Sequence, residues 1–163
     1  GRLRSIRPNN NACSLRPIAR IIRRFKQSKG SLMFAYPLTG LVTLGCLAVL
    51  FWVTLMVGRA RGKHGVKVPD MVGPEPFMYA VRVHLNTIEG LLLFLPALWL
   101  FALTVSDLYA AAVGVFYPVG RILYALGYYQ EPSKREVGFM IGLIATVICL
   151  LGSGYGLVIT LIG

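Results

Sequence analysis

The sequence has little charge and very little acid. Charged residues make up 14% of the chain, and no acidic residue occurs before Asp70. Two long stretches, residues 30–58 and 137–163, contain no charged residue at all. Each stretch is longer than the roughly 20 apolar residues that cross a bilayer of about 30 Å. A chain that is 56% hydrophobic and so poor in charge excludes a water-packed globular fold and indicates a membrane protein.

Cysteine is also scarce. Cys13, Cys46 and Cys149 are far apart, and no pair has the spacing of a metal site or of a CxxC motif. Two of them lie inside apolar stretches, where cysteine commonly serves as a small apolar residue. We therefore expect packing cysteines and no metal cofactor.

The net charge of +11 is concentrated in an N-terminal tail. Nine of the 17 Lys and Arg residues fall in residues 1–29, whereas residues 30–163 have a net charge of only +2. A basic tail is weak support for nucleic-acid binding, and we expect no nucleic-acid partner. We expect residues 1–32 to be a basic N-terminal extension, disordered or non-native, that the chemistry does not need. A presequence, a juxtamembrane arm and an upstream translation are the alternatives.

The remaining residues, 33–163, are expected to form an all-α integral membrane domain with the lipid bilayer around it. The apolar runs predict four membrane-spanning helices at about residues 34–58, 77–104, 108–129 and 137–162. The very short turn at residues 104–107 joins the second and third spans, so these helices should be antiparallel neighbours. The fold class is therefore a four-helix membrane bundle.

Proline and glycine positions add detail to this bundle. Pro96 should kink the second span. Gly138 with Gly142, and Gly152 with Gly156, have the four-residue spacing that lets membrane helices pack closely.

The loops indicate how the bundle is oriented. The first and third loops hold six Lys or Arg residues, and the second loop and the C-terminus hold none. The positive-inside rule places the charged loops in the cytosol. A bacterial inner membrane and a eukaryotic endomembrane remain equally open.

Polar residues recur at helical spacing inside the second span. In "RVHLNTIE", Arg82, Asn86 and Glu89 are separated by four and three residues, so they share one face of the helix. Intramembrane charges cost about 2.5–3.5 kcal/mol each and need partners. We expect Glu89 to form an ion pair with Arg121 of the third span.

The third span repeats the pattern. In "GRILYALGYY", Arg121, Tyr124 and Tyr128 are separated by three and four residues. The two stripes converge in one half of the bundle, below the loop that carries Arg135. Arginines with nearby hydroxyl and amide groups suit a small anionic ligand that enters from the cytosol. A polar network that only packs helices together is the alternative.

"RVHLNTIE" together with "GRILYALGYYQEPSKR" resembles a known family, the membrane-associated proteins in eicosanoid and glutathione metabolism (MAPEG). The likeness is greatest to its prokaryotic-type members and to the type 3 microsomal glutathione transferase, and it covers residues 33–163. The resemblance implies a homotrimer of four-helix bundles. It also implies glutathione bound between neighbouring subunits near the cytosolic face, and a hydrophobic second substrate.

The resemblance also implies roles for individual residues. Carried over by position, the glutathione-binding residues are Arg82, Asn86, Glu89, Arg121, Tyr124, Tyr128 and Arg61. Arg135 matches the arginine that stabilises the glutathione thiolate, so Arg135 and Tyr128 are the expected catalytic residues. Gly90 stands where some family members have tyrosine.

The expected function is that of a membrane-bound glutathione transferase or peroxidase acting on lipophilic electrophiles or lipid hydroperoxides. A non-enzymatic lipid-binding scaffold of the same family is the main alternative, and Arg135 favours the enzyme. A small proton- or ion-coupled transporter is a third hypothesis. Charges confined to one half of the bilayer argue against a continuous conduction path.

Overall fold

The computed structural model describes residues 35–163, of which residues 36–163 form one compact unit. The expected basic extension, residues 1–32, lies outside the described residues. The compact unit consists of α2 (Pro37–His64), α3 (Glu75–Thr104), α4 (Asp107–Gly114), α5 (Phe116–Gln130), the short 3-10 helix η2 (Pro132–Arg135) and α6 (Glu136–Ile162).

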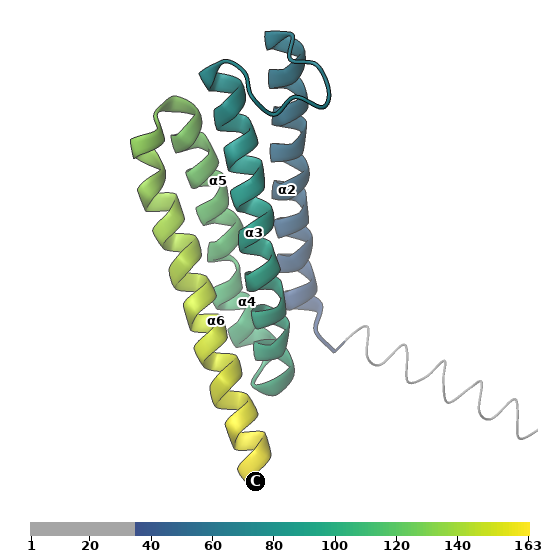
Figure 1. Cartoon of the computed structure of the whole chain (residues 1–163). Coiled ribbons are helices and arrows are strands. Elements are labelled where there is room, and N and C mark those ends of the chain that lie inside the picture. Colours follow the sequence, from purple (N-terminus) through teal and green to yellow (C-terminus); the bar gives the residue numbers. More distant parts are fainter. Residues whose placement is uncertain (1–34) are drawn as a thin grey trace, which may run out of the picture. The chain divides into compact units, whose positions relative to one another are not determined.

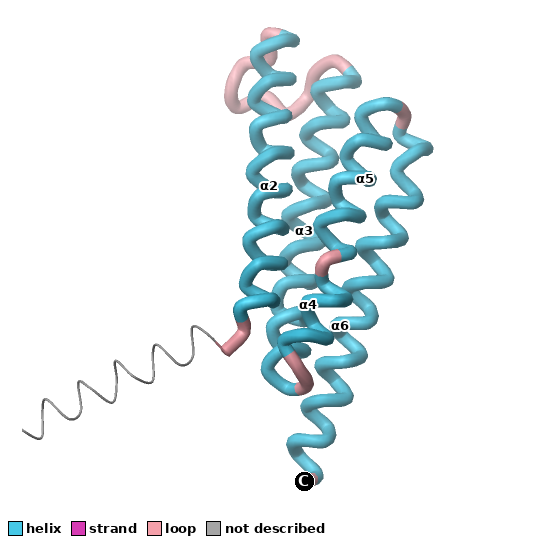
Figure 2. The backbone as a smooth tube through the Cα atoms, turned by 180° about the vertical axis from the view of Figure 1, so that it is seen from behind, coloured by secondary structure: helices cyan, strands magenta, loops and turns pink. Residues whose placement is uncertain are grey.

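These helices make four segments that are long and apolar enough to cross a membrane, with α4 and α5 forming one segment, and η2 and α6 another. The segments lie side by side and alternate in direction (Figure 1, Figure 2). The loop between α2 and α3 and the turn between α5 and α6 lie at one end, which we call the charged-loop end. The turn between α3 and α4 lies at the other end. The predicted all-α membrane bundle is confirmed.

The bundle buries a narrow apolar core and exposes large apolar side chains outside it. Phe94 and Leu98 are fully buried, and so are Cys46 and Cys149, which confirms that these two cysteines pack as small apolar residues. On the outer faces Leu92 is 73% exposed. Lipid can cover such a surface, because the helices satisfy their own backbone hydrogen bonds.

Helix α2 extends past its expected end near residue 58 to His64. Arg and Lys are good helix formers, and their positive charges interact favourably with the C-terminal end of a helix dipole. The helix ends at Gly65, whose φ of 65° is left-handed and whose N–H bonds to the carbonyl of Arg61. The sequence predicted that Arg59 and Lys63 belong to the first loop. In the structure they lie on the last turns of α2.

The third span is interrupted between α4 and α5, at Val115. Pro118 explains the break, because it has no N–H and its ring collides with the carbonyl four residues earlier, that of Gly114. Helix α3 continues through Pro96, the position where the sequence predicted a kink.

Asp107 ties the start of α4 to the start of α2. Its carboxylate accepts backbone hydrogen bonds from Thr39 at 2.8 Å and from Leu38 at 3.1 Å. A negative charge stabilises the N-terminal end of a helix dipole. This contact holds the end of the bundle opposite the charged loops together.

Glycines allow α6 to approach its neighbours closely, as their spacing predicted. A Cβ atom on Gly138 would meet the carbonyl oxygen of Gly120 at 2.6 Å and would overlap the backbone of Tyr124. A Cβ on Gly152 would lie 2.6 Å from the ring of Phe101. The approach of α6 to α5 therefore requires glycine at residue 138.

We predict that Gly138→Ala destabilises the bundle, because α6 must move away from the α5 backbone. The expected loss in unfolding free energy is about 1–3 kcal/mol, the usual cost of overpacking. The measurement is denaturant or thermal unfolding of the purified protein in detergent. Gly154→Ala on the same helix is the control, because a Cβ there meets no atom of the described residues within 4 Å. Equal effects of the two substitutions would contradict the close-packing assignment.

Candidate functional site

A cavity of about 600 Å³ opens between α3, α5 and the start of α6, and we call it the polar pocket. Its volume is in the usual range for small-molecule sites, about 300–1,000 Å³. It is lined by Arg82, Asn86, Tyr124, Tyr128, Arg135, Glu136, Phe139 and Met140. Five of the residues predicted from the sequence thus gather around one cavity.

Hydrogen bonds connect three helical elements across the polar pocket. The side-chain amide of Asn86 on α3 donates to the hydroxyl of Tyr124 on α5 at 2.5 Å. Nη1 of Arg135 on η2 donates to the hydroxyl of Tyr128 at 3.3 Å, and the guanidinium lies 5.2 Å from the centre of that ring. The pocket therefore presents a cation and a tyrosine hydroxyl at the same point.

Arg121 does not line the polar pocket but lies buried behind it. Its Nε donates to the hydroxyl of Tyr117 at 3.0 Å. Its guanidinium lies 5.0 Å from the centre of the Tyr117 ring and 5.6 Å from that of Tyr124. Arg121 therefore supports Tyr124 from inside the bundle.

The predicted ion pair between Glu89 and Arg121 is wrong. Within residues 35–163, the one ion pair joins Glu131 and Lys134 at 3.5 Å. The guanidinium of Arg121 occupies the space next to Gly90, where a Cβ atom would overlap it. Glu89 is about 100° away around the helix and its side chain is exposed.

Two residues that accommodate Arg121 were not predicted as partners. Gly90 leaves room for the guanidinium, and Tyr117 accepts its hydrogen bond while its ring stacks on Phe94 at 3.9 Å between ring centres. A signal for Tyr117 was present, since it precedes Arg121 by four residues and therefore shares its helix face. No spacing rule predicted that the missing side chain at Gly90 would leave room for the guanidinium of Arg121.

Arg61 lies away from the polar pocket in the single chain. Its Nη1 donates to the carbonyls of Lys67 at 3.0 Å and Asp70 at 2.9 Å, and its guanidinium lies 5.1 Å from the centre of the Phe77 ring. Arg61 therefore holds the loop between α2 and α3 in place.

The charges of the polar pocket favour an anion. Arg82 and Arg135 supply two positive charges, and Glu136 supplies one negative charge. Lys134 is paired outside the pocket with Glu131, whose pKa lies below its usual range because Ser133 donates to the carboxylate and Lys134 is close to it. Among the described residues, no group of His, Cys, Asp and Glu has the arrangement of a metal site.

The fold and this pocket together define an integral, multi-pass membrane bundle with an arginine- and tyrosine-lined cavity near one end of its spans. Residues 39–155 match the family model of MAPEG, and the chain belongs to this family.

Several curated proteins are similar in sequence. An uncharacterised protein of Synechocystis is 46% identical over 109 residues, which is 66% of this chain and 80% of that protein. Human microsomal glutathione S-transferase 2 is 33% identical over 103 residues, 63% of this chain and 70% of that protein. Leukotriene C4 synthase of Cavia porcellus is 34% identical over 97 residues, 58% of this chain and 65% of that protein. The family expected from the motifs is therefore confirmed.

We predict that Tyr117→Phe destabilises the bundle although it preserves the ring stacked on Phe94. The substitution removes the acceptor of a buried arginine, and an unsatisfied buried polar group costs about 1–3 kcal/mol. The measurement is unfolding free energy in detergent. Tyr155→Phe is the control, since Tyr155 is 65% exposed, and its effect should stay within about 0.5 kcal/mol. A Tyr117→Phe protein as stable as the control would show that Arg121 does not depend on this hydroxyl.

Proposed function

We propose that the chain is a membrane-bound glutathione transferase or peroxidase that acts on lipophilic electrophiles or lipid hydroperoxides. MAPEG membership and relatives named as a glutathione transferase and a leukotriene C4 synthase support this proposal. The observation that carries it is the contact between Arg135 and Tyr128 at the polar pocket, where a thiol could be held and ionised.

Glutathione has carboxylates, an ammonium group and a thiol, and the polar pocket offers partners for each kind of group. Arg82 would bind a carboxylate, since guanidinium matches the geometry of that anion. Asn86 and Tyr124 would hold the peptide groups, with Arg121 keeping Tyr124 in position. Glu136 is the acidic residue that lines the pocket, so it is the natural partner for the ammonium group.

Arg135 is the proposed thiolate stabiliser, with Tyr128 as hydroxyl donor beside it. A free thiol with a pKa of about 8.5 is only about 3% ionised at pH 7. Because the thiolate is the nucleophile, an unassisted site would leave most bound glutathione unreactive. A neighbouring cation that lowers the thiol pKa by about two units raises the ionised fraction to roughly three quarters, which corresponds to about 2.7 kcal/mol.

We propose that the chain assembles as a homotrimer with glutathione between subunits. Arg82 and Glu89 are exposed in the single chain although both lie on a membrane-spanning helix, and Glu89 is at the middle of α3. Charges exposed to lipid at such depth cost about 2.5–3.5 kcal/mol each. A neighbouring subunit over this face would remove Glu89 from lipid and bring it toward bound glutathione. The proposed contact of Arg61 with glutathione would likewise come from the next subunit.

The proposed orientation puts the charged-loop end, and with it the polar pocket, on the cytosolic side. Lys and Arg gather at that end, and cytoplasmic loops carry an excess of these residues. Glutathione would then enter from the cytosol, and the hydrophobic second substrate would enter from the bilayer.

The second candidate function is a lipid-binding scaffold without catalysis. The enzyme and the scaffold would use the same fold and the same ligand pocket. Catalytic turnover is therefore the property that distinguishes them. Binding of glutathione without conversion of an aromatic halide or a lipid hydroperoxide by the purified protein would favour the scaffold.

We predict that native mass spectrometry of the detergent-purified protein gives the mass of three chains. The physical reason is the pair of exposed charges on α3, which need cover from protein. The spectra are recorded with and without saturating glutathione. A protein that is monomeric under both conditions would contradict the proposed assembly and the shared site.

We predict that the intact protein turns over an aromatic halide or a lipid hydroperoxide with glutathione, and that Arg135→Ala loses most of this activity. Glutathione binding should persist, because Arg82 remains, while the ultraviolet absorbance of bound thiolate is lost. The fall in thiolate fraction at pH 7 should be more than tenfold, as expected for a pKa rise of about two units.

Lys134→Ala is the matched control for this substitution, because Lys134 is the adjacent cation but is paired with Glu131 outside the pocket. The control should retain both the thiolate signal and the rate. If Arg135→Ala behaves like the control, the thiolate assignment passes to the hydroxyls of Tyr128 and Tyr124.

A further inference from the structure

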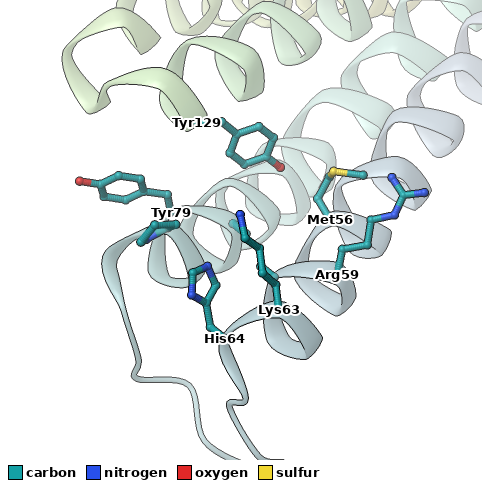
Figure 3. Close-up of a pocket in the computed structure, with 9 residues that line it drawn as sticks. Met56, Arg59, Lys63, His64, Tyr79 and Tyr129 are labelled. Carbon is teal, nitrogen blue, oxygen red and sulfur yellow. The ribbon is translucent and has the colours of Figure 1, made fainter.

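A second cavity lies between the ends of α2, α3 and α5 and shares no lining residue with the polar pocket. We call it the basic pocket; its volume is about 240 Å³, and Arg59, Lys63, His64 and Tyr129 line it (Figure 3). None of the described residues that line it is acidic. The glutathione site proposed above leaves this cavity without a role.

The cations of the basic pocket are available to a ligand. Arg59 and Lys63 are four residues apart on α2, so they project from the same helix face. Both side chains are exposed, and neither forms an ion pair in the described part of the chain. Two neighbouring cations without a counter-charge attract an anion.

Tyr129 gives a second, independent sign of a ligand. Its hydroxyl is buried and has no hydrogen-bond partner among the described residues. Buried polar groups without a partner are rare in folded proteins. The side chains of Tyr129 and Lys63 extend toward the same part of the cavity, whereas the hydroxyl of Tyr79 points away from them (Figure 3). A ligand oxygen between Tyr129 and Lys63 would satisfy both groups.

The position of the basic pocket indicates a lipid as the source of the anion. The pocket lies at the charged-loop end, in the last turns of α2 and α5, where spans meet the headgroup layer. An apolar groove lies deeper along the same two helices, lined by Ala48, Val49, Trp52, Ile122 and Leu126. A basic site above an apolar groove matches a molecule with an anionic head and a hydrocarbon tail.

We propose that the basic pocket binds the phosphoryl headgroup of an anionic phospholipid, with an acyl chain in the groove between α2 and α5. Basic pockets between transmembrane helices bind such headgroups through several cations at once. Arg59 and Lys63 contact the phosphoryl oxygens, and Tyr129 donates its hydroxyl to one of them. Met56 and Ala80 form the apolar wall next to the glycerol backbone.

The test compares binding of phosphatidylglycerol and phosphatidylcholine, with identical acyl chains, to the detergent-purified full chain by native mass spectrometry. The wild-type protein should retain phosphatidylglycerol preferentially. The double substitution Arg59→Gln and Lys63→Gln should weaken its affinity about thirtyfold, roughly fivefold for each cation removed. Equal retention of the two lipids by the wild-type protein would overturn the proposal.

The matched control is the double substitution Lys67→Gln and Lys134→Gln. It removes the same charge from the same end of the bundle, but neither residue lines the basic pocket. This variant should retain phosphatidylglycerol like the wild-type protein. If it loses as much affinity as the pocket variant, the effect is one of general surface charge and the site does not exist.

Tyr129→Phe tests the hydroxyl without changing any charge. Its phosphatidylglycerol affinity should fall several-fold, while the unfolding temperature without lipid stays the same or rises, because the hydroxyl loses no hydrogen-bond partner within residues 35–163. Unchanged lipid affinity would show that Tyr129 does not contact the lipid.

A second test uses glycerophosphate, which has the headgroup but no acyl chain. It should not raise the unfolding temperature of the wild-type protein. If glycerophosphate stabilises the protein as much as phosphatidylglycerol does, the pocket binds a soluble anion and the proposal of a lipid ligand is overturned.

Discussion

The packing of α3 against α5 depends on how the bundle accommodates the guanidinium of Arg121. A charge inside a membrane protein needs a polar partner and protein around it. Gly90 leaves the space, and Tyr117 supplies both an acceptor and a ring beside the charge. Tyr124 packs on the other side and directs its hydroxyl to Asn86 at the polar pocket. The buried charge and the pocket are therefore parts of one arrangement.

A second constraint is the distance between α5 and α6. Gly138 lies against the backbone of α5, so the turn that precedes α6 is held over the end of α5. This turn carries Arg135, and the close approach brings its guanidinium to Tyr128. The proposed chemistry depends on the contact between Arg135 and Tyr128. This contact therefore depends on Gly138, a glycine on the surface of α6 that follows Arg135 by three residues.

The two pockets differ in chemistry although both lie at the charged-loop end. The polar pocket includes Glu136 beside its arginines, which suits a ligand with charges of both signs. Among the described residues, the lining of the basic pocket includes no acid, and an apolar groove lies deeper along α2 and α5, which suits an anionic lipid. The ring of Tyr79 from the basic pocket meets the ring of Tyr128 from the polar pocket, with 5.6 Å between their centres. A physical contact therefore connects the two sites.

The sequence by itself determined the membrane class, the number of spans and most of the polar pocket. Hydropathy and helical spacing are local properties, so they placed Arg82 with Asn86 on one helix and Tyr124 with Tyr128 on another. Only the tertiary structure decided which polar groups meet. Glu89 faces outward and Arg121 pairs with Tyr117, because the rotation of each helix about its axis depends on packing with its neighbours. The space beside Gly90 likewise arises only where helices come together, and so does the Tyr129 hydroxyl, which has no partner in the described part of the chain.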